Sequence, residues 1–120
     1  MPLFILSEPQ AWSIGVAFLL MALDIVTGLS AALINGEFSS SKMREGLGHK
    51  AMLACVIVLA CVLEVAGSHI AGLGFSGVTI VSVCVYICAM EVGSIMENIC
   101  SAYPELKNTS LFKVFNSKEE

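Results

Sequence analysis

The sequence predicts an all-α integral membrane protein with three transmembrane helices and a short cytoplasmic C-terminal tail. The chain of 120 residues is 57% hydrophobic and 13% charged, whereas about a quarter of the residues in soluble domains are charged. Three apolar segments each reach the ~20 residues that a helix needs to cross the hydrocarbon core. The regular alternation of apolar and polar residues that is typical of membrane β-strands does not occur.

The three predicted spans belong to one membrane domain, residues 1–106, because a chain of this length holds one compact unit. The first ten residues contain no Lys or Arg and no cleavage site follows, so the first apolar segment is expected to stay as an anchor. The spans are predicted over residues 11–35, 47–66 and 76–98.

The connections between these segments carry helix-ending residues. Asn35-Gly36 is expected to end the first helix, and a polar segment, residues 37–49, follows it. The uncharged, glycine-rich segment Gly67–Gly74 is expected to join the second and third helices as a tight hairpin. Pro104 marks the exit from the third helix.

The six basic residues predict the orientation, since Lys and Arg are concentrated in cytoplasmic segments. They lie only around the first connection and in the C-terminal tail, which three spans place on the same side. We therefore expect the N-terminus outside and the C-terminus in the cytoplasm. Within the tail, residues 107–120, an apolar face of Leu111, Phe112 and Phe115 could form a short interfacial helix, and a solvated tail is an equal alternative. The basic residues are Lys42, Arg44, Lys50, Lys107, Lys113 and Lys118.

Nothing in the sequence indicates catalysis, a cofactor or a metal site. The five cysteines form no CxxC pair, and neither histidine has a cysteine at ligand spacing. No nucleophile–base arrangement and no phosphate-binding glycine loop are present. With six basic residues and no basic run, nucleic acid is not an expected partner.

Four acidic residues lie within or at the ends of the apolar segments: Asp24, Glu64, Glu91 and Glu97. A carboxylate near the bilayer centre costs about 2.5–3.5 kcal/mol on insertion scales, so such residues usually face partner helices or water. Asp24 is the most central of the four. Glu64 and Glu91 lie nearer segment ends, and Glu97 is expected at the interface.

Helical spacing gathers the polar and small residues of each segment on one side. These stripes could hold the three helices of one chain together, or they could face other copies or a water-filled lesion. Because three stripes with four acids exceed what a three-helix unit is expected to satisfy, the sequence favours self-assembly. The candidates for a helix interface or a pore lining are Asp24, Thr27, Gly28, Ala32, Cys61, Glu64, Cys84, Cys88, Glu91, Ser94 and Asn98.

Several short motifs, in this order and spacing, resemble the toxin-secretion/phage-lysis holin family. An Asp and a Gly in the first span, a Ser-Ser linker and a Gly before a Lys at the second span form the N-terminal part of the resemblance. A Glu followed by Ser-Ile and Glu-Asn, and then a proline, forms the C-terminal part. The tail departs from the family pattern, since Ser101-Ala102-Tyr103-Pro104 replaces the usual Gly-x-Pro. The matching residues are Leu23–Gly28, Ala31–Leu33, Phe38–Ser41, Arg44–Leu47, Lys50-Ala51, Glu91, Ser94-Ile95, Glu97-Asn98 and Pro104.

This resemblance implies a phage- or prophage-encoded protein of the bacterial cytoplasmic membrane that assembles with itself into lesions. Such lesions release an endolysin or a toxin, and the cell lyses. Asp24 would then be central to assembly, and Thr27 and Gly28 would permit close packing. The residues also leave an alternative from another class, a small proton- or cation-coupled transporter or channel subunit that uses Asp24 and Glu91. A passive membrane scaffold is a third hypothesis.

Overall fold

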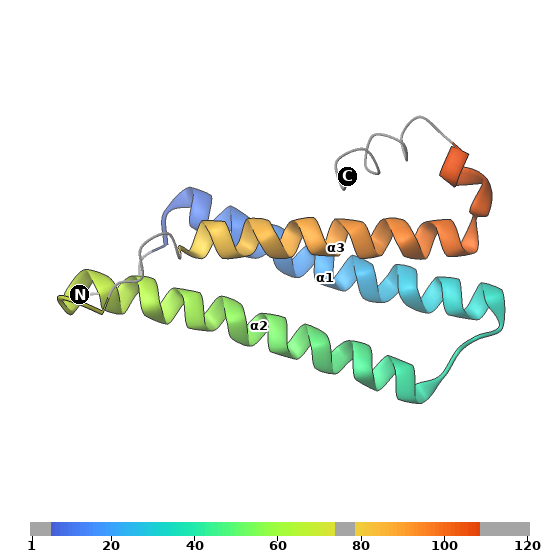
Figure 1. Ribbon diagram of the computed structural model, residues 1–120, viewed down its shortest axis with the longest axis horizontal. Helices are drawn as coiled ribbons and strands as arrows, with labels where there is room; N and C mark the ends of the chain where they lie inside the picture. The colour runs from blue at the N-terminus through green and yellow to red at the C-terminus, as the bar shows by residue number, and fades with distance from the viewer. Residues whose placement is uncertain (1–5, 74–78, 109–120) are drawn as a thin grey trace.

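The computed structural model describes residues 6–73 and 79–108, which form three long helices and one short one (Figure 1). The long helices are α1, Glu8–Asn35; α2, Ser40–His69; and α3, Ile80–Ala102. A 3₁₀-helix, η1, covers Pro104–Asn108. All three long helices have the length and composition to cross a membrane, and the described ranges contain no strand. The predicted all-α transmembrane fold is confirmed.

Helix α1 begins three residues before its apolar segment because a capping box starts it. The Ser7 side chain accepts a hydrogen bond from the Gln10 backbone N–H, and the Gln10 side chain bonds back to the Ser7 N–H. The helix ends where Asn35-Gly36 predicts. Gly36 adopts a left-handed conformation, φ +67°, and its N–H bonds to the carbonyls of Ala32 and Leu33.

Helix α2 is longer at both ends than its apolar segment. It begins at Ser40, because Ser39 caps it and the polar residues after Ser39 are compatible with a helix. At the other end the helix continues through Gly67 and Ser68 to His69, so the predicted hairpin over Gly67–Gly74 is wrong for its first three residues. The Ser68 hydroxyl donates to the Val65 carbonyl, which keeps this polar residue inside the helical pattern.

Helix α3 begins at Ile80, after Thr79 in the cap position, and it runs four residues beyond the predicted end. It stops at Ala102 because the residue before a proline disfavours helical backbone, and Pro104 follows Tyr103. Residues 76–78 of the predicted third span lie outside the described residues. The same holds for the tail beyond residue 108, including its candidate interfacial face, Leu111, Phe112 and Phe115.

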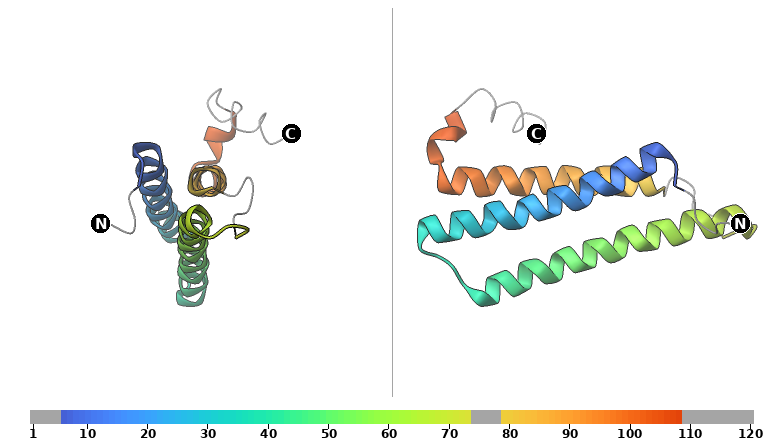
Figure 2. Two further views of the ribbon diagram at one scale, coloured as in Figure 1. Left: turned by 90° about the vertical axis from the view of Figure 1, so that its left-hand side faces the viewer. Right: turned by 180° about the vertical axis from the view of Figure 1, so that it is seen from behind.

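The three helices make an asymmetric bundle. Helix α1 packs along most of α3, whereas α2 approaches this pair near the α3 N-terminus and diverges toward the α1–α2 connection (Figures 1 and 2). The apolar core therefore lies in the half where all three helices meet. Its buried members are Ala17, Met21, Ile57, Ile80, Cys84 and Ile87.

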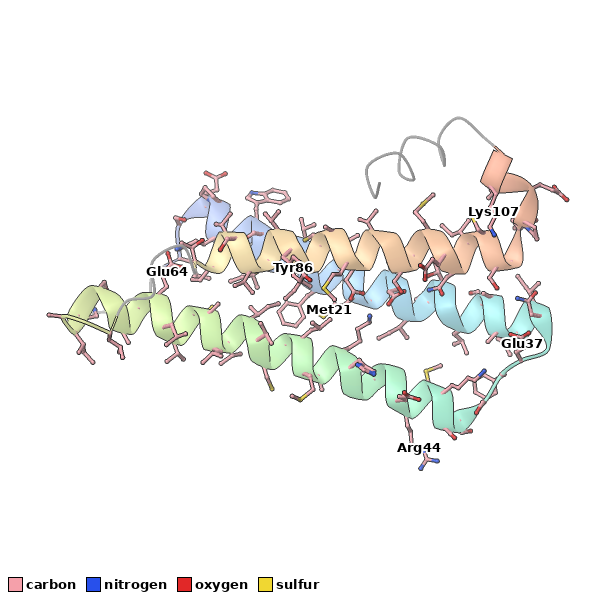
Figure 3. All side chains as sticks on the ribbon, viewed as in Figure 1. Met21, Glu37, Arg44, Glu64, Tyr86 and Lys107 are labelled. Atoms are coloured by element: carbon pink, nitrogen blue, oxygen red, sulfur yellow. The ribbon has the colours of Figure 1, made fainter. Side chains whose placement is uncertain are left out.

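The outward surfaces of the helices are apolar, as a lipid environment requires. Large exposed apolar side chains occur along every helix, and Figure 3 shows such side chains directed away from the bundle axis. A helix of 28 or 30 residues is about 42–45 Å long, so α1 and α2 can extend past a ~30 Å hydrocarbon core into the headgroup region. Examples are Trp12, Leu19, Val26, Leu33, Val58, Val62, Val85 and Tyr86.

Candidate functional site

Three charged side chains, one from each long helix, meet inside the bundle. The Lys50 Nζ atom of α2 lies 2.5 Å from Asp24 Oδ2 of α1. The same Nζ atom lies 2.7 Å and 3.0 Å from the two carboxylate oxygens of Glu91 in α3. We call these residues, Asp24, Lys50 and Glu91, the charged triad. It ties the diverging half of α2 to the α1–α3 pair.

The two acids of the triad are buried, whereas the Lys50 side chain is 17% exposed. Asp24 is 8% exposed and Glu91 is 2% exposed. Two carboxylates thus share one ammonium group in a setting where water is scarce. A buried ion pair adds little stability by itself, but removal of one partner leaves an uncompensated charge, which is strongly destabilising. The arrangement therefore makes the fold depend on Lys50.

Asn98 of α3 completes the polar contacts of Asp24. Its Nδ2 atom donates to Asp24 Oδ1 at 2.8 Å and to the Asp24 carbonyl at 3.2 Å. It also lies 3.1 Å from Thr27 Oγ1, and the Thr27 hydroxyl donates to the same Asp24 carbonyl. Asp24 is therefore held from both sides, by Lys50 on one oxygen and by Asn98 on the other.

Gly28 leaves room for the Asn98 amide. A Cβ atom at position 28 would lie 3.4 Å from Asn98 Nδ2, at the boundary of ordinary van der Waals contact. The close approach of α1 and α3 at this point thus depends on a small residue, as is common between membrane helices.

Substitution at Gly28 should therefore depend on size. We expect Gly28→Ala to be tolerated, with stability within about 1 kcal/mol of wild type, because Ala fits the space and favours the helix. Gly28→Leu should displace Asn98 and weaken the α1–α3 contact. Resistance to SDS-induced unfolding in micelles measures both effects. If the Leu and Ala variants are equally stable, the helices α1 and α3 do not depend on a small residue at position 28.

Glu64 forms a separate polar contact at the opposite end of the bundle. Its Oε1 atom accepts from Gln10 Nε2 at 3.0 Å, and its Oε2 atom accepts from the Ile80 backbone N–H at 2.6 Å. A carboxylate at the first turn of α3 satisfies a free N–H group and interacts favourably with the helix dipole. Glu64 thus connects α2 to the starts of α1 and α3 (Figure 3).

The predicted candidates separate into three groups. Six of them, Asp24, Thr27, Gly28, Glu91, Ser94 and Asn98, gather around the triad or line the groove beside it. Ala32 lines the same groove farther along α1. Cys84 is fully buried in the apolar core, and Cys61 and Cys88 pack against that core. Glu64 lies at the other end.

The polar stripes are satisfied within one chain. Among the described residues, every buried side-chain nitrogen or oxygen has a hydrogen-bond partner. The expectation that three helices cannot satisfy these stripes is therefore wrong. The reason is Lys50, which supplies three charge-assisted contacts to the two most buried acids.

Sequence reasoning missed Lys50 as a site residue and treated it chiefly as an orientation charge. One signal could have revealed it. Lys50 lies inside the apolar stretch of the second span, and a cation at such a position usually pairs with an acid on another helix. Gln10 and the Asn35–Ser101 contact between α1 and α3 were also missed, because polar residues near helix ends give no specific pattern.

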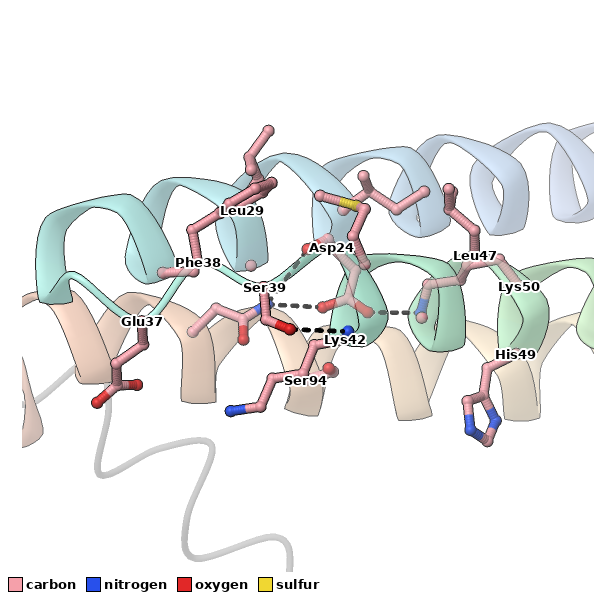
Figure 4. A pocket seen from close by; sticks show the side chains of 16 residues that line it. Asp24, Leu29, Glu37, Phe38, Ser39, Lys42, Leu47, His49, Lys50 and Ser94 are labelled. Atoms are coloured by element: carbon pink, nitrogen blue, oxygen red, sulfur yellow. Dashed lines mark hydrogen bonds and ion pairs between the residues drawn. The ribbon is translucent and has the colours of Figure 1, made fainter.

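A groove of about 400 Å³ opens between α1 and α2 on the side of the α1–α2 connection (Figure 4). It forms where α2 diverges. Asp24, Lys50, Ser94 and Asn98 are among its polar lining residues. The apolar lining residues are Ile25, Leu29, Phe38, Met43 and Leu47. The groove thus leads from the surface of the bundle to the charged triad.

A family model described as the bacteriophage holin family matches residues 6–106, which include the triad, Asn98 and all three long helices. The chain belongs to the bacteriophage holin family. Holins are membrane pore-forming proteins and not enzymes, and the three apolar helices indicate that this holin-family chain is a membrane protein. Searches of curated proteins and of solved structures gave no match.

Proposed function

We propose that the chain is a holin that assembles with itself in the bacterial cytoplasmic membrane and forms lesions. These lesions would release an endolysin or a toxin, and the cell would lyse. The observation that carries this proposal is the combination of the family match with a set of intramembrane acids and amides whose buried polar atoms are satisfied within one chain. Apolar outer surfaces keep a single copy stable in the bilayer.

The structure suggests how a harmless monomer and a lesion could use the same residues. In one chain, the diverging half of α2 is joined to α1 and α3 mainly through the charged triad. If α2 moves away, Asp24, Glu91 and Asn98 lose their enclosure and need new polar partners or water. Other copies of the chain would supply those partners, and the exposed polar faces would then line the lesion.

Expression in a bacterial host tests this function. We expect normal growth first, followed by an abrupt loss of membrane potential, followed by lysis when an endolysin is co-expressed. A potential-sensitive dye and culture turbidity report the two events. Cells that keep full membrane potential while the protein accumulates in the membrane would contradict the proposal.

The same experiment separates the holin from a coupled transporter. The triad is the observation that supports this second candidate, since intramembrane acids that line a groove are typical of proton and cation sites. A transporter should show saturable, substrate-specific flux without lysis. Asp24→Asn should abolish that flux, whereas in a holin it should change the time of lysis.

We further propose that the N-terminus lies outside and that the α1–α2 connection lies in the cytoplasm, following the distribution of Lys and Arg. Arg44 projects away from the bundle (Figure 3), which makes position 44 accessible to a label. In a cysteine-free background, Arg44→Cys should react with an impermeant maleimide only after the cells are permeabilised. Labelling of intact cells would reverse the orientation.

A further inference from the structure

We propose that the α1–α2 groove binds a membrane phospholipid whose headgroup carries both a phosphate and a primary ammonium group. One acyl chain would lie along the apolar wall of the groove. The phosphate would contact Lys42, and the ammonium group would contact Glu37. This proposal does not depend on the proposed lytic function, because lipid binding is measured with the purified chain in vesicles and not in bacterial cells.

The groove has the size and lining of a ligand site. Its volume of about 400 Å³ falls within the ~300–1,000 Å³ of small-molecule sites. The wall contributed by Ile25, Leu29, Phe38, Met43 and Leu47 is apolar. Water in contact with this wall would be unfavourable, whereas an acyl chain would remove the same apolar surface from water. The wall therefore favours lipid over water.

The position of the groove places its rim near the lipid headgroups. Helix α2 has 30 residues and is about 45 Å long, which exceeds a ~30 Å hydrocarbon core by several turns. The residues from Ser40 to Glu45 are mostly polar or charged, so this first part of α2 suits the headgroup region. Glu37, Ser39 and Lys42 line the groove at this end.

Two opposite charges line the rim without contacting each other. Among the described residues, the ion pairs are those of Lys50 with Asp24 and Glu91, so Lys42 and Glu37 are not paired. Lys50 is already engaged by both acids and is not available to a ligand. A cation and an anion on one rim complement a headgroup that carries a phosphate and an ammonium group.

Neighbouring charges do not offer the same site. Arg44 and Glu45 are exposed on the same helix but do not line the groove. His49 lines it, and in Figure 4 its ring extends away from Asp24 and Lys50. An anionic lipid without an ammonium group would satisfy Lys42 but would place its charge near Glu37. The pair of rim charges therefore favours the aminophospholipid.

Photo-crosslinking in vesicles tests the proposal. The purified full-length chain is reconstituted into vesicles of phosphatidylethanolamine, phosphatidylglycerol and phosphatidylcholine, with a trace of one photoactivatable phospholipid of each headgroup in turn. We expect the phosphatidylethanolamine probe to label the groove residues most strongly. Stronger labelling by the phosphatidylglycerol probe, or equal labelling by all three probes, would overturn the headgroup assignment.

Two glycines give a matched test of the groove itself. A Cβ atom added at Gly46 or at Gly48 would meet no other atom within 4 Å, so both positions of α2 have open space for a larger side chain such as Leu. Gly46 lines the groove, and Gly48 does not. Gly46→Leu should fill the groove and remove the labelling, whereas Gly48→Leu should leave it unchanged. Equal labelling of the two variants would overturn the site.

Charge variants test the two headgroup contacts separately. Lys42→Gln should lower labelling by all the probes about threefold, and Glu37→Gln should lower only the phosphatidylethanolamine preference by a similar factor, as expected for exposed ion pairs. Glu45→Gln is the control and should change nothing. If Glu37→Gln leaves the preference intact, the ammonium contact is wrong.

Discussion

Replacement of Lys50 by Met is expected to destabilise the three-helix fold by about 3–5 kcal/mol, the usual effect of leaving a buried charge without its partner. Asp24 and Glu91 would then face each other inside the bundle with no cation between them. Resistance to SDS-induced unfolding in micelles, followed by near-ultraviolet circular dichroism, measures the loss. Lys42→Met is the control, because Lys42 makes no ion pair with any described residue.

A triple substitution distinguishes a missing partner from a simple packing defect. In Asp24→Asn, Lys50→Met, Glu91→Gln, no ionised group remains in the triad, so most of the stability lost in Lys50→Met should return. The side-chain amide introduced at position 24 keeps an oxygen that can accept the hydrogen bond from Asn98. If Lys50→Met is as stable as the control, or if the triple variant is less stable than Lys50→Met, the triad does not hold the fold together.

The second large effect concerns the time of lysis. Asp24→Asn removes one of the two acids that Lys50 contacts and weakens the connection between α1 and α2. A hydrogen bond to a charged group contributes about 1.5–3 kcal/mol, which corresponds to a change of tenfold or more in an opening equilibrium. If α2 must leave the α1–α3 pair before assembly, lysis should begin several-fold earlier after induction than in wild type.

Turbidity and membrane potential after induction, at matched protein levels, measure this timing. Glu97→Gln is the matched control, because Glu97 lies on α3 but is exposed. That control should lyse cells at the wild-type time. Lysis by Asp24→Asn that is delayed or unchanged would contradict the role of the triad in holding the chain closed.

The pattern of apolar segments was sufficient to predict the fold class and the number of spans, because membrane helices need long apolar runs and little else does. Helix ends were harder to predict. The segment from Ser40 to Gly46 is mostly polar but helical, and Gly67 and Ser68 continue α2, since capping and local hydrogen bonds determined these ends. Hydropathy predicts only the part of a helix that is expected to lie inside the hydrocarbon core, and this part is shorter than the helix.

The candidate site was predictable in part. Spacing placed Asp24, Gly28, Glu91 and Asn98 on the inner faces of their helices, and the structure brings these residues together. Spacing within one helix does not show which residue of another helix lies opposite. The choice of Lys50 as the common partner depends on the tilt of α2, which no local pattern encodes. The groove depends on the same tilt.

The triad has a consequence for the order in which the chain enters the membrane. When α1 is inserted first, Asp24 has neither Lys50 nor Asn98 beside it, and an unpaired acid at mid-helix costs about 2.5–3.5 kcal/mol. Lys50 follows only 26 residues later, close enough for α1 and α2 to be inserted together as a helical hairpin. A truncated chain that ends before Lys50 should therefore be retained poorly in the bilayer during synthesis.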